Sequence, residues 1–113
     1  MPVKNIVAAI KLTNIASSTL TGAYQAINTG LSSPCFLIRI INNSSTDVTV
    51  SYDGINDNDY IPHGTFVDLN FATNSQPNNN CALMPINTIV YVKGTAGTGN
   101  IYLAGYYQPA SPF

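Results

Sequence analysis

The stretch RIINNSSTDVTVSYDGINDNDYIPHG, residues 39–64, decides the fold class. Within it, DVTVSYD (47–53) alternates strictly between apolar and polar side chains. Val48, Val50 and Tyr52 lie on one face of the expected strand, and Thr49 and Ser51 lie on the other. Such alternation is typical of a strand that packs one face on a core. A turn rich in Asp and Asn follows directly.

The segments on either side of this stretch also read as strands. CFLIRIIN (35–42) is a continuous apolar and β-branched run, which predicts a strand buried on both faces. FVDLNF (66–71) alternates again, with Val67, Leu69 and Phe71 inward and Asp68 and Asn70 outward. Both patterns place this part of the chain in a sheet.

The rest of the chain continues the pattern. Further strands are expected at residues 3–13, 18–28, 60–62, 88–94 and 100–108, although two alanines leave a helix possible at 3–13. The last two strands are predicted to form a hairpin around TAGTG (95–99). No segment holds a helical apolar period for three turns, and turn clusters recur every 8 to 12 residues. We therefore predict an all-β fold, an antiparallel β-sandwich or jelly-roll-like barrel of about eight strands.

The length of 113 residues predicts a single domain, residues 1–113. Residues 1–17 are expected to form an N-terminal arm, and the proline-rich segment 109–113 a C-terminal tail that ends in Phe113. Residues 72–87 are rich in Asn and Pro and are expected to form an exposed loop.

The composition is unusually poor in charge. Charged residues make up 8% of the chain, the five acids are all Asp, and the net charge is −1, whereas typical domains contain about 25% charged residues. This favours a protein packed against neighbours, since interface cores are depleted in charge. The four Lys and Arg side chains are too few to neutralise the phosphates of a bound nucleic acid, so nucleic-acid binding is not expected. No apolar run approaches the ~20 residues that span a membrane.

The two cysteines, Cys35 and Cys81, lie 46 positions apart without a CxxC spacing. The first residues contain polar interruptions that do not fit a signal peptide. We expect reduced core thiols, with a disulfide as the open alternative.

The acidic turn carries Asp53, Asp57 and Asp59, whose oxygens are ligands that calcium prefers. The spacing does not match an EF-hand, because the glycine at the sixth position and the closing Glu are missing. Asp and Asn also bond their own backbone in turns. The prediction is a connecting turn without a metal, and calcium at Asp53, Asp57 and Asp59 stays open.

No catalytic or cofactor-binding residues are assigned. His63 is the only histidine, and a triad with Asp68 and a serine can be imagined, but no GxSxG motif supplies the nucleophile. GTAGTG (94–99) lacks the Lys-Ser/Thr ending of a phosphate loop. A protein without enzymatic activity is expected.

Tyrosines concentrate near the last strand. Tyr102, Tyr106 and Tyr107 lie on it, and Tyr91 lies on its expected partner. Tyrosines on one sheet face can anchor a protein interface, or they can be half-buried at the rim of the sandwich. We take Tyr102, Tyr106, Tyr107 and Phe113 as the interface candidates.

Taken together, RIINNSSTDVTVSYDG, YIPHGTFVDLNF and VYVKGTAGTGNIYLAGYYQ resemble small β-sandwich virion proteins of tailed bacteriophages. The shared pattern covers residues 36–71 and 88–108. The resemblance implies a capsid decoration (cement) protein, or a head-neck or tail/fibre adaptor. It also implies the major capsid protein or other virion proteins as partners, a homo-oligomer or lattice, and a virion assembled in bacterial cytoplasm. A carbohydrate-binding module of a virion or secreted protein is the alternative.

Overall fold

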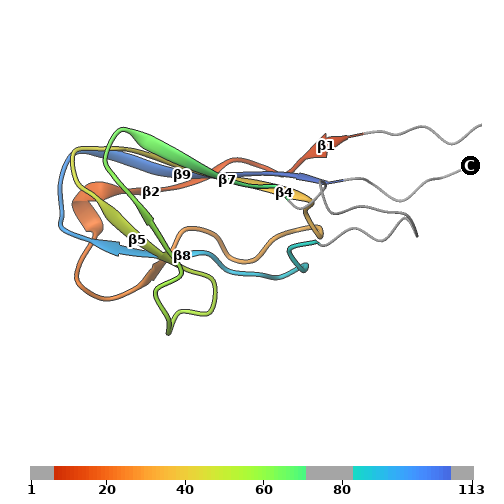
Figure 1. Ribbon diagram of the computed structural model, residues 1–113, viewed down its shortest axis with the longest axis horizontal. Coiled ribbons are helices and arrows are strands. Elements are labelled where there is room, and N and C mark those ends of the chain that lie inside the picture. Colours follow the sequence, from red (N-terminus) through yellow and green to blue (C-terminus); the bar gives the residue numbers. More distant parts are fainter. Residues whose placement is uncertain (1–6, 71–82, 108–113) are drawn as a thin grey trace, which may run out of the picture.

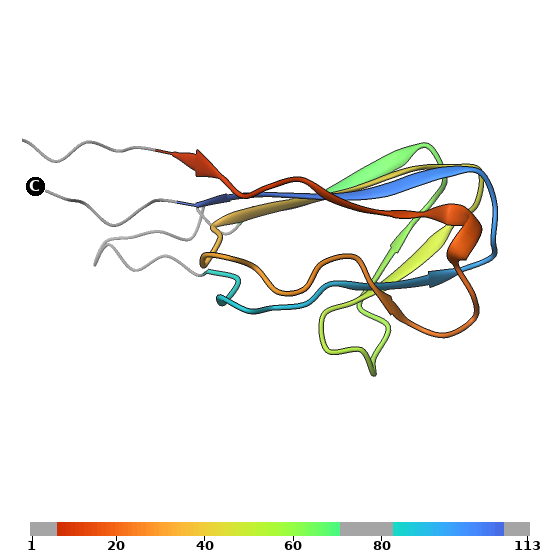
Figure 2. The same cartoon turned by 180° about the vertical axis from the view of Figure 1, so that it is seen from behind.

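The computed structural model describes residues 7–70 and 83–107, and these form an all-β fold. Nine strands build two antiparallel sheets that pack as a sandwich, and one 3-10 turn, η1 (Ser17–Thr19), is the only helical element of the described residues. The two layers are seen edge-on in Figure 1 and from behind in Figure 2. The predicted β-sandwich is confirmed.

One sheet has five strands and the other has four. The five-stranded sheet has β9 and β4 at its centre, β7 beside β4, and β1 and β2 both paired with β9. Its strands are β1 (Ala8–Ala9), β2 (Thr13–Ala16), β4 (Leu37–Ser44), β7 (Thr65–Asn70) and β9 (Gly99–Tyr107). The four-stranded sheet has the order β3-β8-β5-β6, with β3 (Gln25–Ala26), β5 (Val48–Ser51), β6 (Asp59–Ile61) and β8 (Tyr91–Gly94).

The core lies between the sheets and is built from inward-facing aliphatic side chains. Its fully buried members include Ile38, Ile40, Val48, Val50, Ile61, Val90, Val92, Ile101 and Leu103. The predicted inward positions Val48 and Val50 are confirmed, and Tyr52, Val67 and Leu69 pack against the core while partly buried. Phe71 lies outside the described residues. Ser51, predicted to face outward, is fully buried, and its Oγ accepts a hydrogen bond of 2.9 Å from the Gly54 N–H.

Four connections cross from one sheet to the other at the same end of the sandwich. They join β2 to β3 through η1, β4 to β5, β6 to β7 and β8 to β9, and they lie together at the left of Figure 1. The predicted hairpin of residues 88–94 and 100–108 is therefore wrong, because β8 pairs with β5 while β9 pairs with β4. Glycine allows the last crossing: Gly99 has φ +88, and a Cβ there would lie 2.2 Å from the Asn43 carbonyl oxygen.

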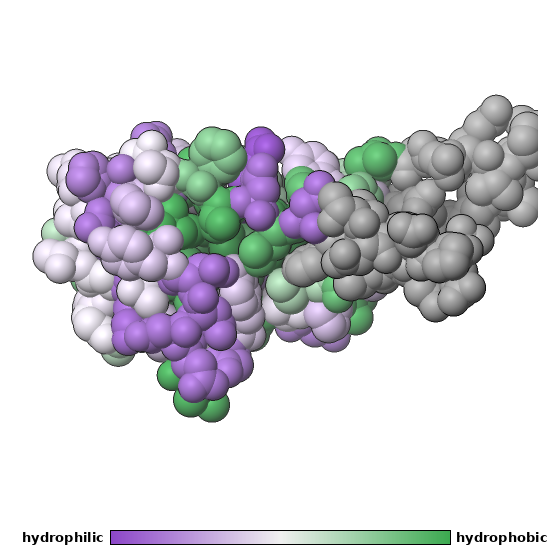
Figure 3. All heavy atoms as spheres, in the orientation of Figure 1, coloured by the Kyte–Doolittle hydropathy of each residue, from purple (hydrophilic) through white to green (hydrophobic). Residues whose placement is uncertain are grey.

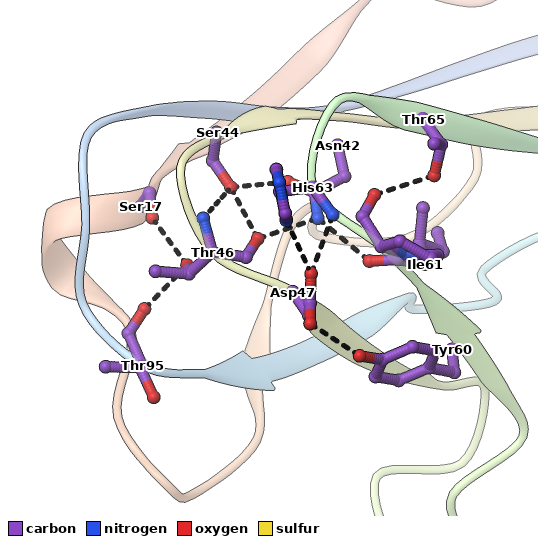
Figure 4. A network of polar contacts seen from close by, with 11 residues as sticks. Ser17, Asn42, Ser44, Thr46, Asp47, Tyr60, Ile61, His63, Thr65 and Thr95 are labelled. Carbon is purple, nitrogen blue, oxygen red and sulfur yellow. Dashed lines mark hydrogen bonds and ion pairs between the residues drawn. The ribbon is translucent and has the colours of Figure 1, made fainter.

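A polar network ties these crossings together (Figure 4). Asn42 is fully buried, and its Nδ2 donates to the carbonyl oxygens of Thr46 and Ile61, both at 2.9 Å. Thr46 Oγ1 donates to the Thr95 carbonyl oxygen at 2.8 Å. Asn42 Oδ1 accepts from Ser44 Oγ, so both polar atoms of this buried side chain are paired, as a stable interior requires.

The N-terminal third departs from the predicted strands. The only strand within residues 18–28 is the two-residue β3, although Leu20 and Ile27 of this segment are buried in the core. Two pieces of the expected N-terminal arm, Ala8–Ala9 and Thr13–Ala16, pair with β9. Local alternation does not distinguish a strand from an extended segment that lacks a pairing partner.

Cys35 is buried and carries a free thiol, whose pKa is raised by burial. Cys81 lies outside the described residues, as do the tail 109–113 and most of the predicted loop 72–87. Within the described part of the chain, no helix is long and apolar enough to cross a membrane.

Candidate interaction surface

The outward side of the five-stranded sheet carries a row of large apolar side chains. Ile40 and Asn42 are fully buried, so Ile41 between them points away from the core. The register places Tyr102 of β9 opposite Ile41 on one side and Phe66 of β7 opposite it on the other. Tyr102, Ile41 and Phe66 therefore form one row across three strands, which we call the apolar row.

The apolar row continues into a wider surface, the outer sheet face. The outward alternation and the register add Leu37, Arg39, Asp68, Ala104 and Tyr106. The strand β4 is thus buried on one face only, and the prediction that it is buried on both is wrong for the chain by itself. An apolar run of this kind is expected where both faces of a strand are covered.

A shallow open groove of about 320 Å³ follows the apolar row. Leu12, which precedes β2, lines it together with Ile41, Phe66 and Tyr102. The side chains at the two ends stand clear of the protein, because Phe66 is 59% exposed and Leu12 is 55% exposed. Large apolar side chains gathered around one groove are typical of a binding surface.

The charges on the outer sheet face neutralise each other. Arg39 Nε donates to Asp68 Oδ1 at 2.6 Å and its second guanidinium nitrogen donates to Asp68 Oδ2 at 3.1 Å. The guanidinium also lies 5.3 Å from the centre of the Phe66 ring. The bond from Arg39 lowers the pKa of Asp68, so the pair stays charged at neutral pH. Covering this face would leave neither charge without a partner.

The outward side of the four-stranded sheet is polar by comparison. Tyr60, Thr49 and Lys93 form its cross-strand row. Tyr60 Oη donates to Asp47 Oδ2 at 2.6 Å, and Lys93 Nζ lies 3.0 Å from Asp57 Oδ1. The two sides of the sandwich therefore differ in chemistry.

The acidic turn projects from the polar side, and hydrophilic residues gather there in Figure 3. Asp53 Oδ1 accepts the backbone N–H groups of Ile55 and Asn56 at 2.8 and 2.9 Å, which lowers the pKa of Asp53. Its second oxygen accepts from Asn56 Nδ2 at 2.9 Å. Asp53 thus shapes the turn, in the way that Asp commonly does.

The other two acids are also engaged within the chain. Asp59 Oδ2 accepts from Tyr52 Oη at 2.5 Å, and Asp57 accepts from Tyr24 Oη and lies beside Lys93. The Lys93 ammonium also lies 4.6 Å from the centre of the Tyr24 ring. Among the described residues, no three His, Cys, Asp or Glu side chains could hold a metal ion. Each of the three acids therefore has a partner within the chain, and both the connecting turn and the calcium alternative stay predictions.

His63 contacts Asp47, and not Asp68, the partner considered for it in a catalytic triad. Asp47 Oδ1 lies 2.9 Å from His63 Nδ1 and accepts the His63 backbone N–H at 2.8 Å (Figure 4). Asp68 is bound to Arg39 on the five-stranded sheet. The His63–Asp47 pair is exposed, and its two contacts hold the β6–β7 connection against the start of β5.

The three tyrosines predicted as interface candidates lie in two different environments. Tyr102 and Tyr106 lie on the outer sheet face, whereas Tyr107 packs against the core. Phe113 lies outside the described residues. Sequence reasoning missed Leu12, Ile41 and Phe66; the continuous apolar run at 35–42 was the available signal for Ile41, but it indicated burial within the fold.

Fold and surface together define a β-sandwich with one apolar and one polar outer side. No protein-family model matches the chain, and no curated protein matches it. A similar solved structure comes from the work entitled "Bacillus endospore appendages form a novel family of disulfide-linked pili". The alignment covers 93% of this chain and 88% of that chain, with 11% sequence identity and a TM-score of 0.48.

This finding corrects the resemblance to tailed-phage virion proteins. The similar structure belongs to a bacterial appendage, so the predicted roles in capsid decoration, head-neck or tail are wrong. The predicted virion location is contradicted in the same way, and the comparison supports neither the capsid partner nor the carbohydrate-binding alternative. The physical reason is that an alternating strand followed by an Asp-Gly or Pro-x-Gly turn is a general device of β-sandwiches.

Proposed function

We propose that this chain is a structural subunit without enzymatic activity, which assembles with other protein chains through the outer sheet face. The observation that carries the proposal is the apolar row of Tyr102, Ile41 and Phe66 on the outward side of β9, β4 and β7. Its aromatic and aliphatic side chains are of the kinds that concentrate at the centre of protein interfaces.

The energetics support a covered rather than a free surface. Full burial of a Phe or Leu side chain is worth about 1.5–3 kcal/mol relative to full exposure. Phe66 and Leu12 are slightly more than half exposed, so covering each would contribute about 1–2 kcal/mol on the same scale. The bound pair Arg39–Asp68 removes the main electrostatic cost, since neither ion would be left alone.

The composition agrees with the surface. A chain with 8% charged residues and a net charge of −1 has little electrostatic repulsion between copies or partners. Such a balance is poorly suited to a free monomer, for which a larger net charge favours solubility. Assembly removes the exposed apolar area that would otherwise drive non-specific association.

Sedimentation equilibrium of the full chain tests this proposal. Wild-type protein should show a mass above 12.0 kDa that rises with concentration. Phe66→Asp should weaken association at least ~tenfold, the effect of about 1.4 kcal/mol. Ile55→Asp is the matched control, because Ile55 is 79% exposed on the acidic turn and the charge change is the same. A folded wild-type protein that stays at monomer mass at high concentration would contradict self-assembly.

A further inference from the structure

We infer that the occupant of the outer sheet face is a second copy of this chain, docked face to face about a two-fold axis along the apolar row. This inference rests on the proposed function and adds the partner, the symmetry and the contacts. It follows from the difference between the two outward sides of the sandwich and from the positions of the charges.

The polarity of the two sides selects the partner surface. Stacking the apolar side of one copy on the polar side of another would press Ile41 and Phe66 against Lys93 and Thr49. Lys93 and its partner Asp57 would lose water in exchange for apolar contacts, which costs free energy. When the apolar sides of two copies meet, both are buried at once, as in an isologous dimer.

The charges select the direction of the two-fold axis. A two-fold axis that lies between the two copies and runs parallel to β4 would place Arg39 opposite Arg39 of the second copy. An axis across the strands at Ile41 exchanges positions 39 and 43 instead, so that Arg39 faces the carboxamide of Asn43. The like charges then lie four residues apart along the strand, about 14 Å, beyond the ~8 Å screening length at physiological salt.

This axis also brings each residue of the apolar row onto its own counterpart. Ile41 would meet Ile41, and the rings of Tyr102 and Phe66 would each meet a ring of the same kind. Aromatic pairs of this type stabilise interfaces beyond the area that they bury.

Cysteine cross-linking tests the geometry in the full chain. Cys81 is replaced by Ser to remove one thiol, and Cys35 stays because it is fully buried. Ile41→Cys is compared with Thr49→Cys, a half-buried position on the polar side. With a short bismaleimide, Ile41→Cys should give a covalent dimer and Thr49→Cys should remain monomeric. If Ile41→Cys does not fold, Tyr102→Cys replaces it, since it lies on the same axis.

Four results would overturn the inference. Equal cross-linking at positions 41 and 49 would show non-specific contact. A cross-link between an Ile41→Cys copy and a Thr49→Cys copy would show stacking of unlike sides. Association in sedimentation without a cross-link at 41 or 102 would place the contact elsewhere, and the proposed function would then stand without this geometry. A chain that is monomeric in sedimentation would exclude a second copy as the occupant of the outer sheet face, whereas assembly with a different protein chain would still stand.

Discussion

Asp47 is the residue whose bonds hold the crossing end of the sandwich. Its carboxylate accepts from Tyr60 Oη, from the His63 backbone N–H and from the His63 ring, and the bond from Tyr60 is the largest cause of its lowered pKa. One acid thereby joins the start of β5 to β6 and to the turn before β7.

This arrangement predicts an acid-dependent loss of stability. The pKa of Asp47 is lowered from 3.8 to about 2 in the folded chain. A lowered carboxylate pKa stabilises the fold at every pH above the unfolded value, and that contribution is lost as pH falls toward the folded value. Thermal unfolding followed between pH 5 and pH 2 should therefore show a melting temperature gap between wild type and Asp47→Asn that narrows from about pH 4 to pH 2. A difference in melting temperature that does not change with pH would mean that the charge of the Asp47 carboxylate does not contribute to stability.

Val50 tests the orientation of the strand that decided the fold class. It is fully buried in the centre of β5, whereas its neighbour Thr49 faces outward. Val50→Asp should unfold the domain, because a buried unpaired charge costs several kcal/mol of a total stability of about 5–15 kcal/mol. Thr49→Asp should leave circular dichroism and solubility close to wild type. A soluble, fully folded Val50→Asp protein would refute the inward orientation.

Among the connections, the crossing from β8 to β9 has an identifiable local constraint at its glycine. Gly99 begins β9 with a positive φ and lies against the Asn43 backbone. Gly99→Ala should lower the free energy of unfolding by about 1–3 kcal/mol, the cost of a strained backbone conformation. The close contact between the added Cβ and the Asn43 backbone should increase this loss. Gly22→Ala is the control, since it has no atom within 4 Å of the added Cβ. Equal effects of the two changes in urea unfolding would contradict the tight crossing.

Elements show where sequence reasoning succeeds and where it fails. The period-2 pattern of DVTVSYD identified β5 and its inward side, because strand alternation is a local property. The turn at TAGTG did not reveal that β8 and β9 belong to different sheets. A glycine-containing link fits a hairpin and a crossing equally well, and the choice is made by pairing partners far away in the sequence.

The same distinction applies to the interaction surface. Tyr102 and Tyr106 could be predicted from their residue type and their position on the last strand. Phe66 could be placed on the outward side as well, because the alternation of FVDLNF puts it on the same side as Asp68 and Asn70. Its position beside Ile41 could not be predicted, because it depends on the pairing of β7 with β4. The apolar run at 35–42 indicated burial on both faces, and the proposed assembly supplies the missing cover for its outward side.

At the scale of the whole molecule, the sandwich has an apolar side and a polar side. The polar side holds the acidic turn, Lys93 and the Asp47–His63 contact. The apolar side holds the row of Tyr102, Ile41 and Phe66 together with the ion pair Arg39–Asp68. This two-sidedness is what a subunit requires when one side binds a neighbour and the other meets water.

Hydroxyl-radical footprinting by mass spectrometry is the most direct test of the outer sheet face as the contact surface, because it reports the solvent accessibility of individual side chains. The full chain is oxidised at low and at high concentration, and Phe66 is compared with Tyr60, which is similarly exposed at 62% but lies on the polar side. Oxidation of Phe66 and Tyr102 should fall several-fold on assembly while Tyr60 stays unchanged. Assembly in which Tyr60 is protected and Phe66 remains fully reactive would contradict the assignment of the outer sheet face.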